Sequence, residues 1–277
     1  MADSHDRAED DRAYPRLVGR DRELRVLEEA LRSIRAGRGR LVLVGGEIGI
    51  GKTALVRQFL AAHASDGLSA LIGRAHDLAA TPPFALWRDL LRSRDARPFA
   101  PPDWDWMLAG EQGNPLDRFA EWLAEITRDG PVAIHLEDIH WADAESLELL
   151  RQLVWRVDSL PVLILATYRD VDVVRGNPLY QQIPSLLRET DAIHIILRRL
   201  DQVATQKLVA DGRRLAPPDL ERLAEFVYTA SQGNPLVCHE VMRTLRVENV
   251  LEPGPPDGAC WRLGLLARLV APPLVRQ

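Results

Sequence analysis

The segment from Gly46 to Thr53, with the sequence GEIGIGKT, restricts the possible folds of this chain more than any other feature. It follows an apolar run, Arg40–Gly45, that predicts a buried strand, and it leads into an amphipathic run, Lys52–Ala64, that predicts a helix. Glycines allow the backbone to turn so that successive N–H groups face inward. The first turn of a helix adds unpaired donors and a partial positive charge. A strand, such a loop and a helix in this order favour an α/β fold that binds phosphate groups.

Lysine is scarce in this chain, which makes the lysine of the loop informative. Among 35 basic residues, only Lys52 and Lys207 are lysines. An ammonium group is a compact point charge that suits a position between two phosphates, whereas the planar guanidinium of arginine prefers bidentate contacts. The hydroxyl of Thr53 suits Mg²⁺, which takes few protein ligands. The alternative, a chance match in a glycine-rich turn, is on the order of one in a thousand for a chain this poor in lysine.

These features predict that the chain binds ATP or ADP together with Mg²⁺. Lys52 is also expected to act in catalysis, and Thr53 to bind the metal. The residues of the loop and helix start that are expected to contact the nucleotide are Gly46, Glu47, Ile48, Gly49, Ile50, Gly51, Lys52, Thr53 and Ala54.

Four further apolar runs alternate with helical patterns along the chain. The runs expected to form strands are Leu68–Arg74, Pro131–Asp138, Pro161–Arg169 and Ala192–Arg198. The segment between the runs Pro131–Asp138 and Pro161–Arg169 has apolar residues at three- and four-residue spacing, which places one apolar stripe on a helix. These residues are Leu147, Leu150, Leu153 and Val154. The alternation predicts a parallel sheet that is covered by helices on both faces.

The segment 75–130 is too long for a simple connection between two strands. We expect extra helices in it, and a loop rich in proline and tryptophan near residues 96–113. After residue 200 the pattern becomes helical. The predicted organisation is a disordered charged tail at 1–15, a core at 16–200, a small helical domain at 201–250 and the start of a further domain at 251–277.

Composition and charge disfavour several classes of function. The net charge is -5 and the pI about 5.8, and the arginines are interleaved with acids, which indicates a mixed-charge surface rather than a nucleic-acid-binding face. No apolar run approaches the ~20 residues of a membrane helix, and the first residues lack the pattern of a secretory signal. Cys238 and Cys260 are too few for a disulfide framework, so a reducing cytoplasm is the expected compartment.

Two adjacent carboxylates, Glu137 and Asp138, end the third predicted strand. In phosphate-loop proteins an acid at the carboxyl end of a neighbouring strand holds Mg²⁺ through water, and a second acid can polarise the attacking water. The alternative is a strand end with two solvated acids. Adjacent strand residues point to opposite faces. We therefore assign the metal side, or its water shell, to Asp138, with Glu137 sharing the catalytic task and the division of the roles left open.

Simpler interpretations suit the residues that follow. Asp143 is expected to cap the helix beginning at Ala144, Trp141 to pack in the interior, and His140 to be a structural histidine. The tripeptide Gly233–Pro235, GNP, indicates a turn with proline at the first helical position. The same tripeptide occurs at Gly176–Pro178 and has little specificity alone.

Two further segments face the predicted nucleotide. Arg169, at the end of the fourth strand, is placed either to sense the terminal phosphate or, equally, to pair with Asp170 or Asp172. The segment LVGRDREL begins the first helix, and its backbone is a candidate for wrapping the adenine. The residues concerned are Val18, Gly19 and Arg20.

Taken in order, these segments resemble the STAND subgroup of AAA-type P-loop NTPases, and in particular the N-terminal ATPase module of large LuxR-type bacterial transcriptional regulators. The segments that carry the resemblance are LVGRDREL, GGEIGIGKTAL, GRAHDLAATPPFALWRDLL, LEDIHWADAESLELLRQL, LILATYRD, LRRL and SQGNPLVCHEVMRTL. They cover nearly the whole chain, and EDIHWAD is much more specific than a phosphate loop alone.

The resemblance implies a five-stranded parallel sheet in the order 5-1-4-3-2, a helical lid domain and the start of a winged-helix domain. It implies that Pro235 of the lid approaches the adenine and that Arg169 occupies the sensor position. It further implies a switch in which ADP holds a closed form, while ATP allows opening and self-association. DNA binding is expected only through C-terminal domains absent from these 277 residues, with no direct nucleic-acid contact by this segment. Glu137 departs from the family's aspartate, which implies slow turnover or altered metal geometry.

Three hypotheses of different classes follow. The favoured one is a slowly hydrolysing ATP switch in a transcriptional regulator; similar modules are also joined to cyclases or kinases, and the short tail before the first helix favours the regulator. The second is a P-loop small-molecule phosphotransferase, whose second substrate would need a pocket such as the segment 75–130 offers. The third is a scaffold that does not use nucleotide, against which the intact Gly51–Thr53 argues.

Overall fold

The computed structural model describes residues 17–78, 81–99, 114–211, 213–252 and 261–264. They divide into two compact units: a core unit, Asp21–Arg199, and a helical unit made of the described residues at 17–20 and from Leu200 onward. The predicted tail at 1–15 and most of the predicted loop at 96–113 lie outside the described residues.

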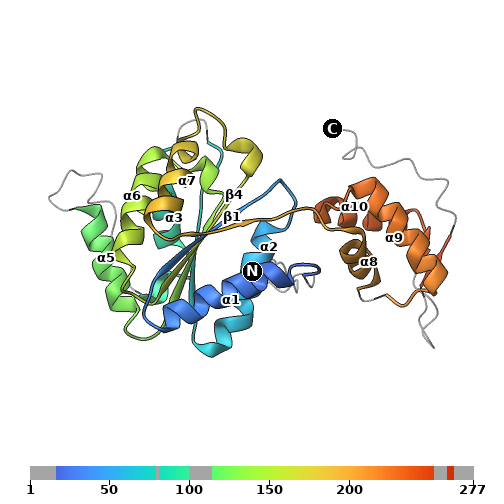
Figure 1. Ribbon diagram of the computed structural model, residues 1–277, viewed down its shortest axis with the longest axis horizontal. Coiled ribbons are helices and arrows are strands. Elements are labelled where there is room, and N and C mark those ends of the chain that lie inside the picture. The colour runs from blue at the N-terminus through green and yellow to red at the C-terminus, as the bar shows by residue number, and fades with distance from the viewer. Residues whose placement is uncertain (1–16, 79–80, 100–113, 212, 253–260, 265–277) are drawn as a thin grey trace, which may run out of the picture. The chain divides into compact units, whose positions relative to one another are not determined.

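The core unit is built on a five-stranded parallel sheet (Figure 1). Its strands are β1 (Arg40–Gly45), β2 (Ser69–Arg74), β3 (Val132–Glu137), β4 (Val162–Tyr168) and β5 (Ile193–Ile196). The order across the sheet is β2-β3-β4-β1-β5, and every pairing is parallel. This order confirms the one implied by the resemblance, read from the opposite edge. All five predicted strands are present; β1 fills its predicted run, and the other four are shorter than theirs.

Helices cover both faces of the sheet, as the alternating pattern predicts (Figure 1). The helices of one face are α1 (Asp21–Arg35) and α2 (Lys52–His63), and those of the other are α3 (Ala85–Arg92), α5 (Pro115–Ile126), α6 (Ala144–Arg156) and α7 (Pro178–Glu189). Short 3-10 helices lie in the connections between these strands and helices in the described part of the core unit: η1 (Ala64–Asp66), η2 (Arg97–Phe99), η3 (Ile139–Trp141) and η4 (Asp170–Asp172). Thus α3, η2 and α5 confirm that the segment 75–130 contains helices of its own.

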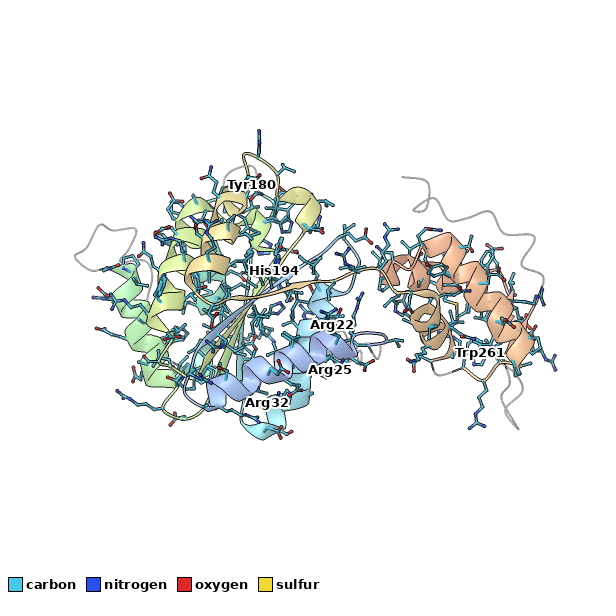
Figure 2. The ribbon with its side chains drawn as sticks, viewed as in Figure 1. Arg22, Arg25, Arg32, Tyr180, His194 and Trp261 are labelled. Atoms are coloured by element: carbon cyan, nitrogen blue, oxygen red, sulfur yellow. The ribbon has the colours of Figure 1, made fainter. Side chains whose placement is uncertain are left out.

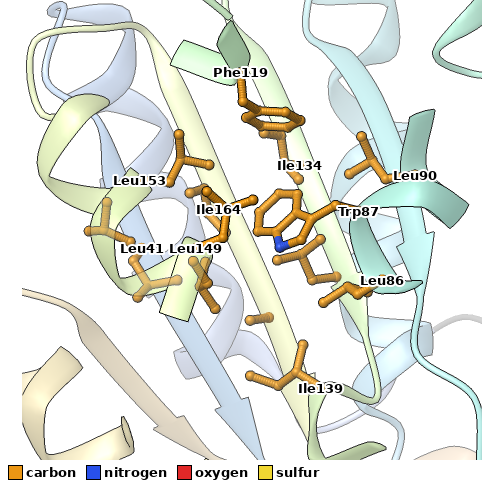
Figure 3. Packing of buried hydrophobic residues seen from close by; sticks show 14 of the residues in the cluster. Leu41, Leu86, Trp87, Leu90, Phe119, Ile134, Ile139, Leu149, Leu153 and Ile164 are labelled. Atoms are coloured by element: carbon orange, nitrogen blue, oxygen red, sulfur yellow. The ribbon is translucent and has the colours of Figure 1, made fainter. Parts of the chain in front are cut away.

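The interior between the sheet and α3, α5 and α6 is large and apolar (Figure 3). The indole of Trp87 lies against the ring of Phe119 edge to face, with 5.0 Å between ring centroids, and both side chains pack on Ile134 and Ile164 of the two central strands. The indole N–H donates to the carbonyl of Ser146 at 2.9 Å, so this buried polar group is satisfied. Strands β3 and β4 are buried along their whole length, which holds their carboxyl ends rigidly in place.

Asp143 fixes two helices at once. Its carboxylate accepts from the N–H of Ser146 at 2.8 Å, which caps α6 as the sequence predicts. The same carboxylate accepts from the N–H groups of Phe84 and Ala85 at 2.8 and 3.1 Å, where α3 begins. One side chain therefore satisfies helix-start donors of both elements, and it ties the segment 75–130 to the turn that follows β3.

The outer surface carries the mixed charge expected from the sequence. Arg22, Arg25 and Arg32 lie along the exposed side of α1 (Figure 2), and Arg32 pairs with Glu29 at 3.8 Å. Such exposed pairs contribute little to stability. Among the residues that the structure describes, no helix combines the length and the apolar character needed to cross a membrane.

The helical unit consists of α8 (Gln202–Ala210), α9 (Pro217–Ser231) and α10 (Pro235–Val247), followed by a short antiparallel pair, β6 (Leu251–Glu252) and β7 (Arg262–Leu263). It has its own apolar interior, built from residues of all three helices. The start of the winged-helix domain, predicted at 251–277, lies mostly outside the described residues and stays a prediction.

The GNP tripeptide before α10 has a clear structural role. Asn234 accepts from the N–H groups of Leu236 and Val237 and so caps the helix. Gly233 has φ 77°, and a Cβ there would lie 2.0 Å from the carbonyl oxygen of Leu200, so only glycine fits. Asparagine followed by proline also begins α5 and α7. The tripeptide is therefore a recurrent helix start in this chain.

Candidate functional site

The loop between β1 and α2 has the backbone that its glycines predict. Gly46, Gly49 and Gly51 all adopt positive φ, at 150°, 74° and 99°. At Gly46, an added Cβ would also approach the side chain of Ile50 to 3.0 Å. Because side chains are strained in these conformations, the loop can turn tightly only with glycine at these positions. Gly51 has no side chain to cap the helix, so the N–H groups of the first turn of α2 remain available to an anion.

Lys52 folds back over this loop. Its ammonium group donates to the carbonyls of Gly46 at 2.7 Å and Glu47 at 2.9 Å, and only 7% of the residue is exposed. Burial lowers the pKa of Lys52, and the charge of Asp138 is the largest influence that raises it again. Arg169 is also close enough to affect this pKa. Two of the three ammonium protons are therefore held by the loop itself, with a carboxylate and a guanidinium nearby.

Asp138 is positioned by the backbone rather than by an ion pair. It leaves the end of β3 with φ 55°, and its N–H donates to the hydroxyl of Thr167 on β4 at 3.1 Å. Its side chain is 38% exposed and lies 3.9 Å from Nδ1 of His140. The left-handed conformation turns this carboxylate out of the strand, where its charge is close enough to raise the pKa of Lys52.

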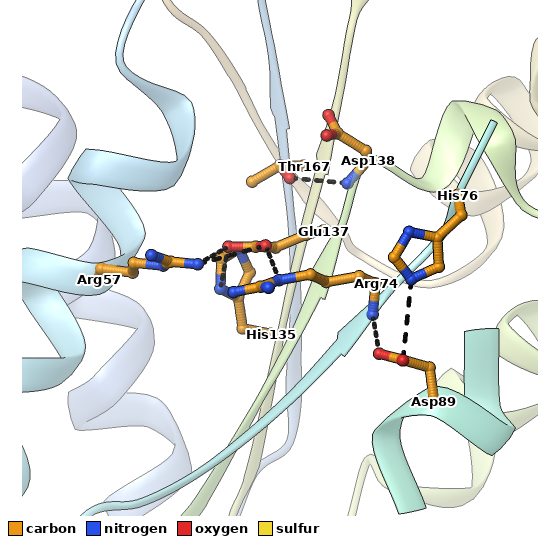
Figure 4. A network of polar contacts seen from close by, with 8 residues as sticks. All are labelled: Arg57, Arg74, His76, Asp89, His135, Glu137, Asp138 and Thr167. Carbon is orange, nitrogen blue, oxygen red and sulfur yellow. Dashed lines mark hydrogen bonds and ion pairs between the residues drawn. The ribbon is translucent and has the colours of Figure 1, made fainter. Parts of the chain in front are cut away.

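Glu137 has entirely different surroundings, although it directly precedes Asp138. Its carboxylate is buried and contacts two guanidinium groups (Figure 4). The distances are 3.1 Å to Arg57 of α2 and 2.5 Å to Arg74 of β2. The structure therefore brings Asp138, but not the Glu137 carboxylate, toward the loop lysine, and the two acids have separate surroundings, as expected of adjacent residues at a strand end.

Arg169 follows β4 and takes the ion-pair arrangement that the sequence left open. Its guanidinium lies 3.7 Å from the carboxylate of Asp172. The main-chain N–H of Arg169 donates to Nδ1 of His140 at 3.4 Å. The Nε2 atom of the same ring lies 3.5 Å from the carboxylate of Asp172. His140 is buried, and burial lowers its pKa, which agrees with a structural histidine. Trp141 packs against the large apolar cluster, as expected.

The remaining predicted contacts belong to the helical unit. Gly19 has φ 70°, and a Cβ there would approach that of Ala204 to 2.7 Å. Arg20 is buried, and Pro235 is the first residue of α10. The roles of Val18, Gly19, Arg20 and Pro235 stay predictions, because these residues belong to the helical unit and the glycine loop belongs to the core unit.

Two polar contacts of this region were missed by the sequence interpretation. Glu47 of the loop forms a bidentate pair with Arg199, at 2.8 Å for both contacts. Arg57 and Arg74 converge on Glu137. A partial signal existed for the second case, because Arg74 ends β2 as Glu137 ends β3, and the two residues are partners in the parallel register. No local spacing indicates the first.

His135 gives a prediction about pH. Its ring is fully buried on β3, neither nitrogen has a hydrogen-bond partner among the described residues, and burial lowers its pKa to about 4. The unfolded chain takes up this proton near pH 6.5 but the folded chain only near 4, so stability from the neutral ring is present above pH 6.5 and is lost between these values. We expect His135→Leu to remove about 3 kcal/mol of the fall in unfolding free energy between pH 6.5 and 4.

Urea unfolding of the nucleotide-free protein at several pH values measures this effect. His76→Leu is the matched control, because it makes the same substitution at a histidine whose side chain is 59% exposed. An unchanged slope in His135→Leu would show that this ring does not titrate in that range.

Comparison with known proteins agrees with this geometry. An uncharacterised protein of Rhizobium meliloti (strain 1021) is 25% identical, with 81% of this chain and 24% of that protein covered. The chain therefore spans about a quarter of the length of this curated relative. Among solved structures, the Walker-type ATPase of Pyrococcus abyssi has a TM-score of 0.51 at 16% identity, covering 84% of this chain and 72% of that one. Cdc6p of Pyrobaculum aerophilum has a TM-score of 0.56 at 15% identity, covering 86% and 65%.

These structural likenesses concern the fold. The sequence match is more specific: residues 16–165, more than half of the chain, match the sequence model of the AAA ATPase domain (AAA_16). The match contains the glycine loop, Lys52, both acids and most of β4. This chain belongs to the AAA ATPase domain family.

Proposed function

We propose that this chain is a regulatory switch module that binds ATP and hydrolyses it slowly to ADP and phosphate. The observation that supports this most strongly is the position of Lys52. Its ammonium group is fixed by two loop carbonyls at the start of α2, with the charges of Asp138 and Arg169 within electrostatic reach. Phosphoryl transfer uses this combination of groups: a cation at the phosphates, a carboxylate beside the metal and a second cation for the terminal phosphate.

Each residue has a proposed role. Main-chain N–H groups of the loop and of the first turn of α2 donate to phosphate oxygens. Thr53 and the partly exposed Asp138 fit Mg²⁺, since a hydroxyl and a carboxylate are the hard oxygen donors it prefers, Asp138 acting partly through water. When bound, Mg²⁺ would neutralise negative charge on the phosphate oxygens. Arg169 exchanges Asp172 for the terminal phosphate. The residues proposed to contact the adenine are Val18, Gly19, Arg20 and Pro235.

The switch component is supported by the pair between Glu47 and Arg199. Glu47 is the second residue of the glycine loop, and its carbonyl also holds Lys52. Arg199 is the last residue of the core unit, directly before the helical unit begins. A nucleotide that moves Glu47 therefore acts on the residue that leads into the helical unit. A difference in affinity between the two arrangements is what a nucleotide switch requires.

We further propose that this module is of the STAND type and belongs to a bacterial transcriptional regulator similar to the large LuxR-type proteins. Its fourfold shorter length than its curated relative is consistent with a module of a longer protein. ATP binding is proposed to promote self-association, and DNA binding is assigned to other domains, because this segment has a net charge of -5. The proposed compartment is the cytoplasm. A module linked to a cyclase or a kinase is the alternative arrangement.

One observation favours a second candidate, a small-molecule phosphotransferase. A polar cavity of about 320 Å³ opens beside the carboxyl end of β2, and Arg74, His76 and Arg92 line it together with Asp89 and Asp95. Its basic side chains suit a small anionic second substrate. The cavity lies in the region that the sequence analysis named for such a pocket.

Product analysis separates the two candidates. In the first experiment, purified protein is incubated with radiolabelled ATP and Mg²⁺, with and without a cell extract of small molecules. In the second, the protein is digested with protease in the presence of ADP or of a slowly hydrolysed ATP analogue. The switch predicts turnover below ~1 s⁻¹, ADP and phosphate as the products, and different cleavage near residue 200 in the two nucleotide states. A labelled small molecule other than phosphate would support the phosphotransferase. No binding of ATP would contradict both.

A further inference from the structure

The carboxyl end of β3 carries an ionic cluster around a buried carboxylate that the proposed function does not use. Here the cluster is called the arginine clamp: Arg57, Arg74 and the Glu137 carboxylate between them (Figure 4). The Arg57 guanidinium donates to one oxygen of Glu137 at 3.1 Å and approaches the other at 3.5 Å. The Nε of Arg74 donates to that second oxygen at 2.5 Å. Only 8% of the Glu137 side chain is exposed.

The clamp joins three elements that surround the proposed nucleotide site. Arg57 lies four residues after Thr53 on α2, so the two side chains share one face of that helix. Arg74 ends β2 and is the register partner of Glu137 on β3. The main-chain N–H of Arg74 also donates to Asp89 of α3 at 2.7 Å. Glu137 therefore connects α2, the helix that follows the loop, to the carboxyl end of β3, where Asp138 lies.

The charges of the clamp oppose a role for Glu137 beside a metal. Two guanidinium groups already occupy both of its oxygens, so a bound divalent cation would meet two positive charges at short range. His135 packs 3.7 Å from the same carboxylate and is fully buried, which closes that side to water. Asp138 has no such competition from arginine within the clamp, and Figure 4 shows the two carboxylates pointing apart.

The length of the side chain fits this assignment. The Glu137 carboxylate reaches both arginines, and the side chain of aspartate is one methylene shorter. A shorter acid at 137 would withdraw from at least one guanidinium, since charge-assisted hydrogen bonds depend on distances near 2.7–2.9 Å. The glutamate, which departs from the family pattern, thus has a use that aspartate would not serve.

We propose that Glu137 is a positioning residue, and that Asp138 alone supplies the carboxylate on the metal side of the site. Glu137 acts through α2 and β3, by tying the helix that follows the loop to the end of β3. This inference rests on the proposed function for the metal itself. The clamp's contribution to folding stability does not depend on it.

The test compares Glu137→Gln, Glu137→Asp and Asp138→Asn in the whole chain. Thermal unfolding of nucleotide-free protein and the Mg²⁺ dependence of ATP hydrolysis are measured for each. Glu137→Gln and Glu137→Asp should lower Tm by about 5–10 °C, because the buried carboxylate that joins Arg57 to Arg74 is neutralised or drawn back. They should lower kcat ~10-fold and leave the Mg²⁺ concentration for half-maximal rate within ~2-fold. Asp138→Asn should leave Tm nearly unchanged and raise the Mg²⁺ concentration for half-maximal rate at least ~10-fold.

A fourth variant protects the test against poor folding. Replacing Arg57, Glu137 and Arg74 together with methionine removes all three charges, and an apolar replacement of ion pairs around a buried group is often tolerated. This protein should keep the wild-type Mg²⁺ requirement. A rise of ~10-fold or more in that requirement, in this variant or in Glu137→Gln, would overturn the proposal, and so would an unchanged Tm in Glu137→Gln. If wild-type protein binds no ATP, the proposed function fails while the Tm comparison still judges the clamp.

Discussion

Lys52→Arg is expected to weaken the binding of ATP by ~100-fold or more, although the positive charge is kept. The ammonium of Lys52 fits between the carbonyls of Gly46 and Glu47, which it contacts at 2.7 and 2.9 Å, and the residue is almost fully buried. A planar guanidinium is wider and cannot occupy the same position without moving the loop. Lys52→Ala should have an effect at least as large, because it also removes the charge.

The chain supplies its own control for this experiment. Lys207, the only other lysine, is exposed on α8 of the helical unit, so Lys207→Arg should leave the affinity within ~2-fold. Affinity is measured by titration with a fluorescent ATP analogue, and circular dichroism checks that each variant is folded. Equal affinities of wild type and folded Lys52→Arg would show that the phosphates do not depend on this side chain.

Asp138→Asn is expected to separate binding from hydrolysis. The residue has φ 55°, which asparagine tolerates, and its anchoring N–H bond to Thr167 is made by the main chain. Folding should therefore be preserved, whereas the carboxylate proposed to act toward the metal is lost. We expect hydrolysis to fall ~100-fold and the Mg²⁺ requirement to rise at least ~10-fold, with ATP affinity in the absence of Mg²⁺ within ~3-fold.

Single-turnover hydrolysis at several Mg²⁺ concentrations measures these effects. Asp170→Asn is a useful control, since Asp170 also influences the pKa of Lys52 but follows β4 rather than β3. It should change the Mg²⁺ requirement by less than ~3-fold. Hydrolysis and Mg²⁺ dependence of Asp138→Asn that match wild type would remove this carboxylate from the site.

The fold was largely predictable because its signals are local. Buried parallel strands such as β3 and β4 appear as unbroken apolar runs, and the glycine loop fixes where one strand must be followed by a helix. Four of the five predicted strands were too long by a residue or more; Pro131 and Pro161, for example, precede their strands rather than begin them. The sheet order came from the resemblance, which periodicity does not encode.

The site was predictable only in part, because several of its contacts join residues far apart in the sequence. The loop and Lys52 follow a fixed spacing, and the structure places them as the spacing implies. The separation of Glu137 from Asp138 depends on Arg57 and Arg74, which lie 80 and 63 residues away from Glu137. The pair of Glu47 with Arg199 spans 152 residues. Such contacts follow from strand register and helix placement, not from any local pattern.

The account depends above all on the loop from Gly46 to Thr53 holding the phosphates of ATP. A crystal structure of the wild-type chain with a slowly hydrolysed ATP analogue and Mg²⁺ tests this most directly. The expected result is a phosphate chain enclosed by the main-chain N–H groups of this loop, with the Lys52 ammonium in contact with it. An analogue bound elsewhere in the chain, with this loop empty at saturating ligand, would contradict the account.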